Sequence, residues 1–216
     1  MLERERERVA LAARQLAADG LVIGTSGNVS ARAGELVAMS PTGADLSALD
    51  PEQVAVVDLE GRQQDGELEP TSEIDLHLGL YRRFEAGGVV HTHAPFATAL
   101  ACALDELPVV HYGLLALGGP VRVAPYATFG TPELAEATLA GLEGRTAVLM
   151  ASHGTLAYGH DVEAAVANSR LLEWGCELYW RAAALGTPRV LDESQRAAVI
   201  EAVVARSYGS THRREQ

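Results

Sequence analysis

The sequence predicts an α/β fold in which a mixed sheet is covered by helices on both faces. Two observations support this prediction. Segments with the apolar spacing of helices alternate along the chain with short segments rich in β-branched residues. No internal repeat or linker-like stretch divides the 216 residues, and 48% of them are hydrophobic, which is enough for one substantial core. We therefore expect a single domain over residues 1–216.

Six segments have helical periodicity and recognisable ends. Gly20 follows the first and suits the C′ position of a helix end. Thr131-Pro132 is an N-cap followed by proline at the first helical position, and Gly186 ends the longest segment. The predicted helices span residues 2–19, 70–84, 95–104, 131–142, 161–184 and 192–206.

The predicted strands are short and bounded by Gly, Pro, Asn or Asp. Residues 28–40 form two strands joined at Ala33-Gly34, and the polar segment 62–69 is interpreted as an exposed hairpin. The remaining strands are expected at residues 54–59, 89–93, 109–112, 121–126, 146–150 and 156–158.

Composition excludes several function classes. The net charge is −12 without a basic stripe, which argues against nucleic acid as a partner. No apolar run is long enough to cross a membrane, and the start MLERERER lacks the apolar core of a signal peptide, so we expect no membrane association and a cytoplasmic location. Cys102 and Cys176 are isolated, which indicates neither a disulfide framework nor a zinc knuckle.

Two histidines end the strand at 89–93. Because side chains alternate across a strand, His91 and His93 project from the same face, and two imidazoles form half of a metal site. A catalytic zinc uses three protein ligands and an open position, and Glu73 and His153 are the best candidates to complete the set. The alternative is that both histidines end a core strand and are satisfied by backbone hydrogen bonds.

Three further segments could face an anion. The stretch Gly24–Asn28 offers hydroxyls, an amide and backbone N–H groups, Pro41–Gly43 is a second Thr/Gly turn, and Thr71-Ser72 can cap a helix whose N-terminus favours negative charge. The alternative readings are ordinary loops. Glu73 could equally complement the helix dipole. We interpret His77 as a packing or hydrogen-bonding residue.

The order and spacing of these motifs resemble the class II aldolase/adducin family, and within it the L-fuculose-1-phosphate aldolases. The resemblance runs from about residue 5 to Gly209 and includes Ser152–Gly154, Ala124–Gly130 and His111-Tyr112. It implies a three-layer α/β/α fold with a mixed, mostly antiparallel central sheet. It also implies a homotetramer with active sites between neighbouring subunits.

The same resemblance implies one zinc per subunit, replaceable by cobalt, held by His91, His93 and His153 with Glu73 as the nearby carboxylate. The implied reaction is the reversible cleavage of a 1-phosphoketose of the L-fuculose 1-phosphate type to dihydroxyacetone phosphate and an aldehyde such as L-lactaldehyde. A metal ion would polarise the carbonyl group. Glu73 would move the proton, accepting it from the substrate hydroxyl or a metal-bound relay in cleavage, and from dihydroxyacetone phosphate in condensation. Tyr112, from the adjacent subunit, would protonate the aldehyde oxygen.

The family's substrate-binding residues match two further sets of positions. Phe129 and Tyr208 correspond to the walls of the aldehyde pocket. Thr71 stands where the aldolases more often have serine, which keeps the hydroxyl but could narrow the pocket. The implied phosphate-binding residues are Thr25, Gly27, Asn28, Thr42, Gly43, Thr71 and Ser72.

Other activities remain open within this family. Pentose-phosphate 4-epimerases and methylthioribulose-phosphate dehydratases share the metal histidines, but His111-Tyr112 and the Tyr208-Gly209 tail favour an aldolase. A metal-free scaffold like the adducin head domain would be expected to lack the histidines that this chain retains.

Overall fold

The computed structural model of the chain describes residues 1–206. The α-helices are α1 (Glu3–Ala18), α2 (Ile74–Arg83), α3 (Pro95–Ala101), α4 (Pro132–Gly141), α5 (Val162–Leu185) and α6 (Glu193–Arg206). Three short 3₁₀ helices are η1 (Leu46–Ala48), η2 (Pro51–Gln53) and η3 (Tyr112–Leu117). The strands are β1 (Asn28–Ala33), β2 (Leu36–Met39), β3 (Ala55–Asp58), β4 (Gln63–Asp65), β5 (Gly88–Thr92), β6 (Glu106–Leu107), β7 (Val121–Ala124), β8 (Ala147–Met150) and β9 (Gly154–Gly159).

The strands form one sheet in the order β4-β3-β2-β1-β5-β9-β8-β7-β6. Within the described residues β7 and β8 run parallel and the other neighbouring strands run antiparallel. The mixed, mostly antiparallel sheet is therefore confirmed. The order places β5 between β1 and β9, which come from distant parts of the chain.

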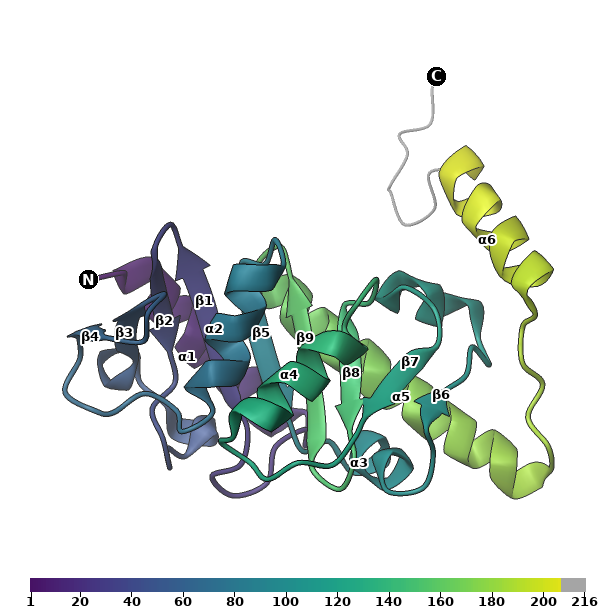
Figure 1. The fold of residues 1–216 in the computed structure, drawn as a ribbon, viewed down its shortest axis with the longest axis horizontal. Helices are drawn as coiled ribbons and strands as arrows, with labels where there is room; N and C mark the ends of the chain where they lie inside the picture. The colour runs from purple at the N-terminus through teal and green to yellow at the C-terminus, as the bar shows by residue number, and fades with distance from the viewer. Residues whose placement is uncertain (207–216) are drawn as a thin grey trace.

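Helices cover both faces of the sheet (Figure 1). One apolar cluster joins α1, α3 and α5 to one face and includes Val29, Val90 and Ala157. A second cluster joins α2 and α4 to the opposite face and includes Val89 and Leu156. Val89 and Val90 are adjacent in β5 and enter different clusters, as the alternation of a doubly covered strand requires. The three-layer arrangement is confirmed.

Helix α6 extends away from the rest of the fold (Figure 1). None of its residues is buried, although Ile200, Val203 and Val204 are apolar. No helix in the described part of the chain is long and apolar enough to span a membrane.

The strand predicted at residues 109–112 is wrong. The chain forms only the two-residue strand β6 before Pro108, and the Val109 carbonyl accepts a hydrogen bond from the Leu191 N–H at 2.9 Å. His111 Nδ1 then accepts from the Gly113 N–H at 3.0 Å and caps η3. The β-branched pair at 109–110 therefore lies in a connection whose hydrogen bonds are local or go to the α5–α6 segment.

Two predicted helix boundaries also differ. Helix α3 ends at Ala101 and not at residue 104. Helix α2 begins at Ile74, with Glu73 as its N-cap, so neither Thr71 nor Ser72 occupies the cap position. The Thr71 hydroxyl instead accepts from the Glu73 N–H at 3.3 Å. The Glu73 side chain makes no cap hydrogen bond to the helix.

Candidate metal and substrate site

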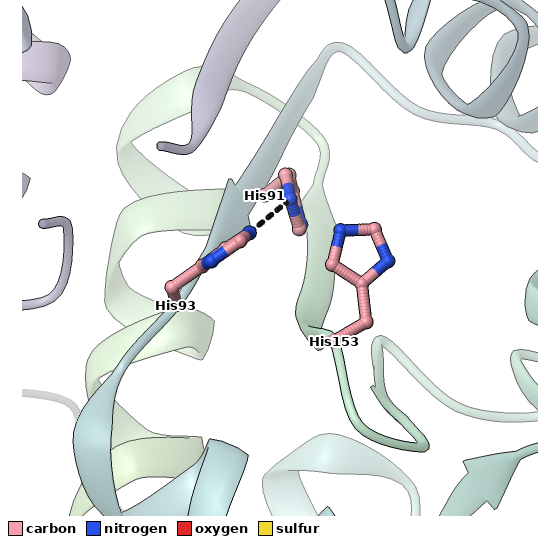
Figure 2. Close-up of side chains that lie close together, drawn as sticks. All are labelled: His91, His93 and His153. Carbon is pink, nitrogen blue, oxygen red and sulfur yellow. Dashed lines mark hydrogen bonds between the residues drawn. The ribbon is translucent and has the colours of Figure 1, made fainter. Parts of the chain in front are cut away.

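His91 and His93 lie at the end of β5 and point toward the same space (Figure 2). Their ring centroids are 4.9 Å apart and the two Nε2 atoms are 3.0 Å apart. His91 is fully buried, whereas His93 is partly exposed on the wall of a cleft. The strand alternation that relates these two positions in the sequence thus brings two imidazole nitrogens together.

His153 comes from the turn between β8 and β9 and completes a triangle of imidazoles (Figure 2). Its ring centroid lies 4.9 Å from that of His91 and 5.2 Å from that of His93. The three ligand nitrogens all lie within 4.8 Å of one another. The preceding residue, Ser152, has a left-handed backbone with φ +53°, which is strained for a residue with a side chain.

Glu73 faces this triangle. Its Oε2 lies 3.1 Å from His91 Nε2, and its Oε1 lies 3.4 Å from His153 Nε2. Asn28 Nδ2 donates to Oε2 at 3.0 Å. Oε1 is buried and accepts no hydrogen bond from the described residues. The carboxylate makes no cap hydrogen bond to α2, and its side chain faces the histidines instead.

The hydrogen bonds of His91 determine which of its nitrogens is available. A carbonyl oxygen can only accept, so His91 Nδ1 donates to the Thr155 carbonyl at 2.8 Å. In the neutral ring Nε2 then carries a lone pair. This backbone contact orients the ring as outer-shell partners orient metal-ligating histidines.

Burial favours neutral imidazoles in the rest of the triangle. Burial and the neighbouring positive charge of His91 lower the pKa of His93 to about 4, and the same causes lower the pKa of His153. Burial raises the pKa of Glu73, but the hydrogen bonds from His91 and Asn28 and the charge of His91 outweigh it and bring the pKa below its usual range. Near neutral pH Glu73 is therefore ionised and His93 and His153 present imidazole lone pairs beside it, while the hydrogen bond from His91 to Glu73 uses a proton on His91 Nε2 that a bound cation would replace.

These groups fit a divalent cation. Lone pairs and a carboxylate repel one another when they converge without a positive charge, and Glu73 Oε1 lacks a donor within the described residues. Three histidine nitrogens with a neighbouring carboxylate are a donor set suited to zinc or a similar metal. The chemistry of the residues is thus consistent with a metal site.

A cleft of about 290 Å³ opens beside the histidines. No Lys or Arg of the described chain lines it, so its polar wall consists mainly of hydroxyl, amide and backbone groups. The lining residues are Thr25, Ser26, Gly27, Asn28, Pro41, Thr42, Gly43, Thr71, Ser72, Glu73, His93, Tyr126, Ala127, Phe129, Ser152 and His153.

The cleft brings together all seven residues that the family resemblance assigns to phosphate binding. Two of them have fewer free donors than the sequence suggests. The Thr42 N–H donates to the Glu69 carbonyl and the Thr71 N–H to the Ser40 carbonyl, each at 3.1 Å. These threonines can meet an anion only through their hydroxyl groups.

The remaining candidates lie in different places. Phe129 lines the cleft and is 69% exposed. Tyr112 begins η3, beside an apolar groove formed with α6, and does not line the cleft. Tyr208 lies outside the described residues.

Sequence reasoning did not single out five residues of the cleft wall, although it identified the motifs that contain them. Each lies within or beside a motif that was already identified, so its position was the available signal. They are Ser26, Pro41, Tyr126, Ala127 and Ser152.

Comparison with known proteins agrees with this geometry. Residues 7–180 match the family described as class II aldolase and adducin N-terminal domain. The chain is 39% identical over 199 residues to a 5-deoxy-D-ribulose 1-phosphate aldolase of Bacillus thuringiensis, covering 90% of this chain and 93% of the relative. It is 41% identical over 192 residues to a 5-methylthioribulose-1-phosphate/5-deoxyribulose-1-phosphate aldolase of Rhodospirillum rubrum, covering 88% and 86%.

A solved structure of an L-fuculose 1-phosphate aldolase superposes with a TM-score of 0.88 at 33% identity. The match covers 93% of this chain and 96% of that one. The family match spans the sheet, the three histidines, Glu73 and the cleft. The chain therefore belongs to the class II aldolase and adducin family.

Proposed function

We propose that this protein is a metal-dependent aldolase that reversibly cleaves a 1-phosphoketose to dihydroxyacetone phosphate and an aldehyde. The observation that carries the proposal is the position of Glu73. Its carboxylate lies 3.1 Å from His91 Nε2 and 3.4 Å from His153 Nε2, on the wall of a cleft lined by hydroxyl groups. A base beside a metal and a phosphate cradle is the combination that aldol chemistry needs.

His91, His93 and His153 would hold the metal, with zinc as the expected ion and cobalt as a substitute. The bound ion would supply Lewis-acid polarisation of the ketose carbonyl. The protein contributes the orientation of the three rings, including the His91 contact with the Thr155 carbonyl. It also contributes a buried environment in which charges interact more strongly than in water.

Glu73 would move the proton on carbon 3 and not, as expected from the sequence, that of the substrate hydroxyl, because one group must handle the same proton in both directions of a reversible step. In condensation it removes this proton from dihydroxyacetone phosphate, and in cleavage it returns the proton to carbon 3 after the bond to carbon 4 breaks. The hydroxyl proton on carbon 4 needs a second acid–base group. Tyr112 would donate it to the aldehyde oxygen in condensation and accept it from the carbon 4 hydroxyl in cleavage.

Tyr112 does not line the cleft of its own chain, which favours a shared site. In an assembly of several copies, expected to be a tetramer, Tyr112 of one subunit would face Glu73 of its neighbour. Mixed oligomers of Glu73→Gln and Tyr112→Phe chains would then regain activity far above the average of the two parents. Activity at that average, in oligomers shown to be mixed, would remove the shared-site proposal.

The cleft would bind the phosphate through neutral donors. The hydroxyls of Thr25, Thr42, Thr71 and Ser72 and the Asn28 amide line it. Hydroxyl donors beside the positive end of the α2 dipole can hold a dianion without an arginine. Asn28→Ala is expected to raise KM for phosphorylated substrates and also to lower kcat, because Asn28 Nδ2 donates to Glu73 Oε2 as well.

Part of the cleft wall suits an apolar end on the part of the substrate that becomes the aldehyde. Tyr126, Ala127 and Phe129 offer aromatic and methyl surface there. The relatives named above act on 5-deoxyribulose 1-phosphate, 5-methylthioribulose 1-phosphate and L-fuculose 1-phosphate. We expect substrates whose aldehyde half ends in a methyl group: 5-deoxyribulose 1-phosphate, which would release acetaldehyde, and L-fuculose 1-phosphate, which would release L-lactaldehyde.

A panel of 1-phosphoketoses tests the function. Release of dihydroxyacetone phosphate, measured with a coupled dehydrogenase, together with the matching aldehyde, supports the aldolase. A product of unchanged mass would indicate an epimerase, and loss of water would indicate a dehydratase. Turnover that persists in protein shown by elemental analysis to be metal-free would remove the metal from the proposal.

A further inference from the structure

A line of buried polar side chains runs from Glu73 into the space between α2 and the sheet. Asn28 Nδ2 donates to Glu73 Oε2 at 3.0 Å, and Asn28 Oδ1 lies 2.5 Å from His77 Nε2. Behind His77, the Ser30 hydroxyl oxygen lies 2.7 Å from Nδ1 and 2.8 Å from the Tyr81 hydroxyl oxygen. All five side chains are buried, and His77 is 0% exposed. The sequence interpretation of His77 as a packing or hydrogen-bonding residue is confirmed.

The fold explains why these five residues meet. Asn28 and Ser30 are two apart in β1 and face the same side of the sheet. His77 and Tyr81 are four apart in α2 and lie on one helical face. Asn28 is also the cross-strand partner of His91, so the line starts beside the histidine triangle.

The hydrogen-bond partners determine the direction of every proton in the line. An ionised carboxylate can only accept, so Asn28 presents its NH₂ group to Glu73 and its carbonyl to His77. That carbonyl can only accept, so His77 Nε2 carries the hydrogen. Burial lowers the pKa of His77 to about 3, so its ring is neutral and Nδ1 accepts from Ser30. Ser30 in turn accepts from Tyr81.

We propose that His77 is a positioning residue: its Nε2–H holds the Asn28 amide in the one orientation that donates to Glu73, and thereby aims the carboxylate at His91 and His153. Without this donor the buried Asn28 oxygen has no hydrogen-bond partner, and only the bond to Glu73 itself holds the amide in place. The amide does not pass a proton from one side to the other, so the line orients Glu73 and is not a proton relay.

Three substitutions separate the two ends of the His77 ring. His77→Gln places an amide N–H near the position of Nε2 and can still donate to Asn28. His77→Asn reaches only the position of Nδ1, and His77→Leu removes both polar atoms. Leu78→Ala is the matched control, because Leu78 is buried in the same helix but has no polar contact. The kinetic readout rests on the proposed function and uses 5-deoxyribulose 1-phosphate as substrate.

We expect His77→Asn and His77→Leu to lower kcat by about 10- to 100-fold, the usual effect of losing an outer-shell partner, and to change KM by less than about threefold. His77→Gln should retain kcat within about threefold of the wild type. Leu78→Ala should lose thermal stability but keep kcat. If His77→Leu does not fold, the kcat values of His77→Gln and His77→Asn test the inference. Equal kcat in these two variants would overturn the inference.

A second readout does not depend on turnover. Because Glu73 lies within 3.4 Å of nitrogens of two proposed ligands, its orientation affects the surroundings of a bound metal. The visible absorption of the Co²⁺-loaded protein should be unchanged in His77→Gln and altered in His77→Asn, at equal cobalt content. Identical spectra in all variants would overturn the inference, even if the wild type proved inactive on every 1-phosphoketose and the proposed function failed.

Discussion

Replacing Glu73 by glutamine separates its chemical role from its structural one. Asn28 Nδ2 requires an acceptor at the position of Oε2, where it now donates at 3.0 Å, so the glutamine oxygen takes that position. The glutamine NH₂ then takes the position of Oε1, which lies 3.4 Å from His153 Nε2. The buried hydrogen bond to Asn28 survives, and we expect the free energy of unfolding to change by less than about 1 kcal/mol.

Activity should respond far more strongly than stability. Loss of a general base typically costs about 10²- to 10⁴-fold in rate, or about 2.7–5.4 kcal/mol of transition-state stabilisation. Glu73→Ala should differ in stability, because it leaves Asn28 Nδ2 buried without its acceptor at a cost of about 1–3 kcal/mol. For a chain of this size each kcal/mol lowers Tm by about 2–4 °C.

Steady-state release of dihydroxyacetone phosphate and calorimetric Tm, measured on both variants, check these values. Asp75→Asn is the matched control: Asp75 is a carboxylate in the first turn of α2, two residues after Glu73, but it is exposed. It should keep wild-type kcat. If Glu73→Gln kept kcat within about threefold while Asp75→Asn did the same, Glu73 would not be the base, and the reasoning from its position would be refuted.

Three further predictions follow from the same geometry. Purified protein should hold about one zinc per chain, measured by elemental analysis after dialysis. His153→Ala should lose this zinc, whereas His160→Ala, which changes an exposed histidine outside the triangle, should keep it. Gly27→Ala should lower Tm more than Gly34→Ala. Both glycines have positive φ, but only at Gly27 would an added methyl group lie 2.9 Å from a carbonyl oxygen of β5. Equal Tm values in the two variants would contradict this. In chelator-treated protein, acid should remove stability through His77, whose pKa falls from an ordinary 6.5 to about 3 on folding. The unfolded state binds the proton first, so the free energy of unfolding should fall by about 1.4 kcal/mol per pH unit as pH drops below about 6.5. Urea unfolding from pH 7 to 5 should show a smaller loss of this free energy in His77→Gln than in the wild type. Equal losses in the two proteins would refute the assignment.

The sequence alone predicted the features that depend on local periodicity. His91 and His93 share a face because side chains alternate along a strand, and the structure places their Nε2 atoms 3.0 Å apart. The helix beginning at Thr131-Pro132 starts where its cap signal predicts. The two covered faces of the sheet followed from the alternation of helices with strands.

Local pattern was insufficient where hydrogen bonds come from distant segments. Val109 lies in a sequence typical of a strand, but its carbonyl accepts a hydrogen bond from the Leu191 N–H, which no local signal could indicate. Glu73 looked like an ordinary first-turn carboxylate, because the donors that orient its side chain lie on other elements. The family resemblance, and not periodicity, had pointed to its role.

Only the tertiary structure decided which residues meet in the site. The sheet order places β5 between β1 and β9, which brings His153 beside His91 and sets Asn28 opposite it in register. The same pairing faces Asn28 toward α2, where His77 holds its amide. Strand order and register are chosen by the packing of the whole core on both faces of the sheet, so no short stretch of the chain contains them.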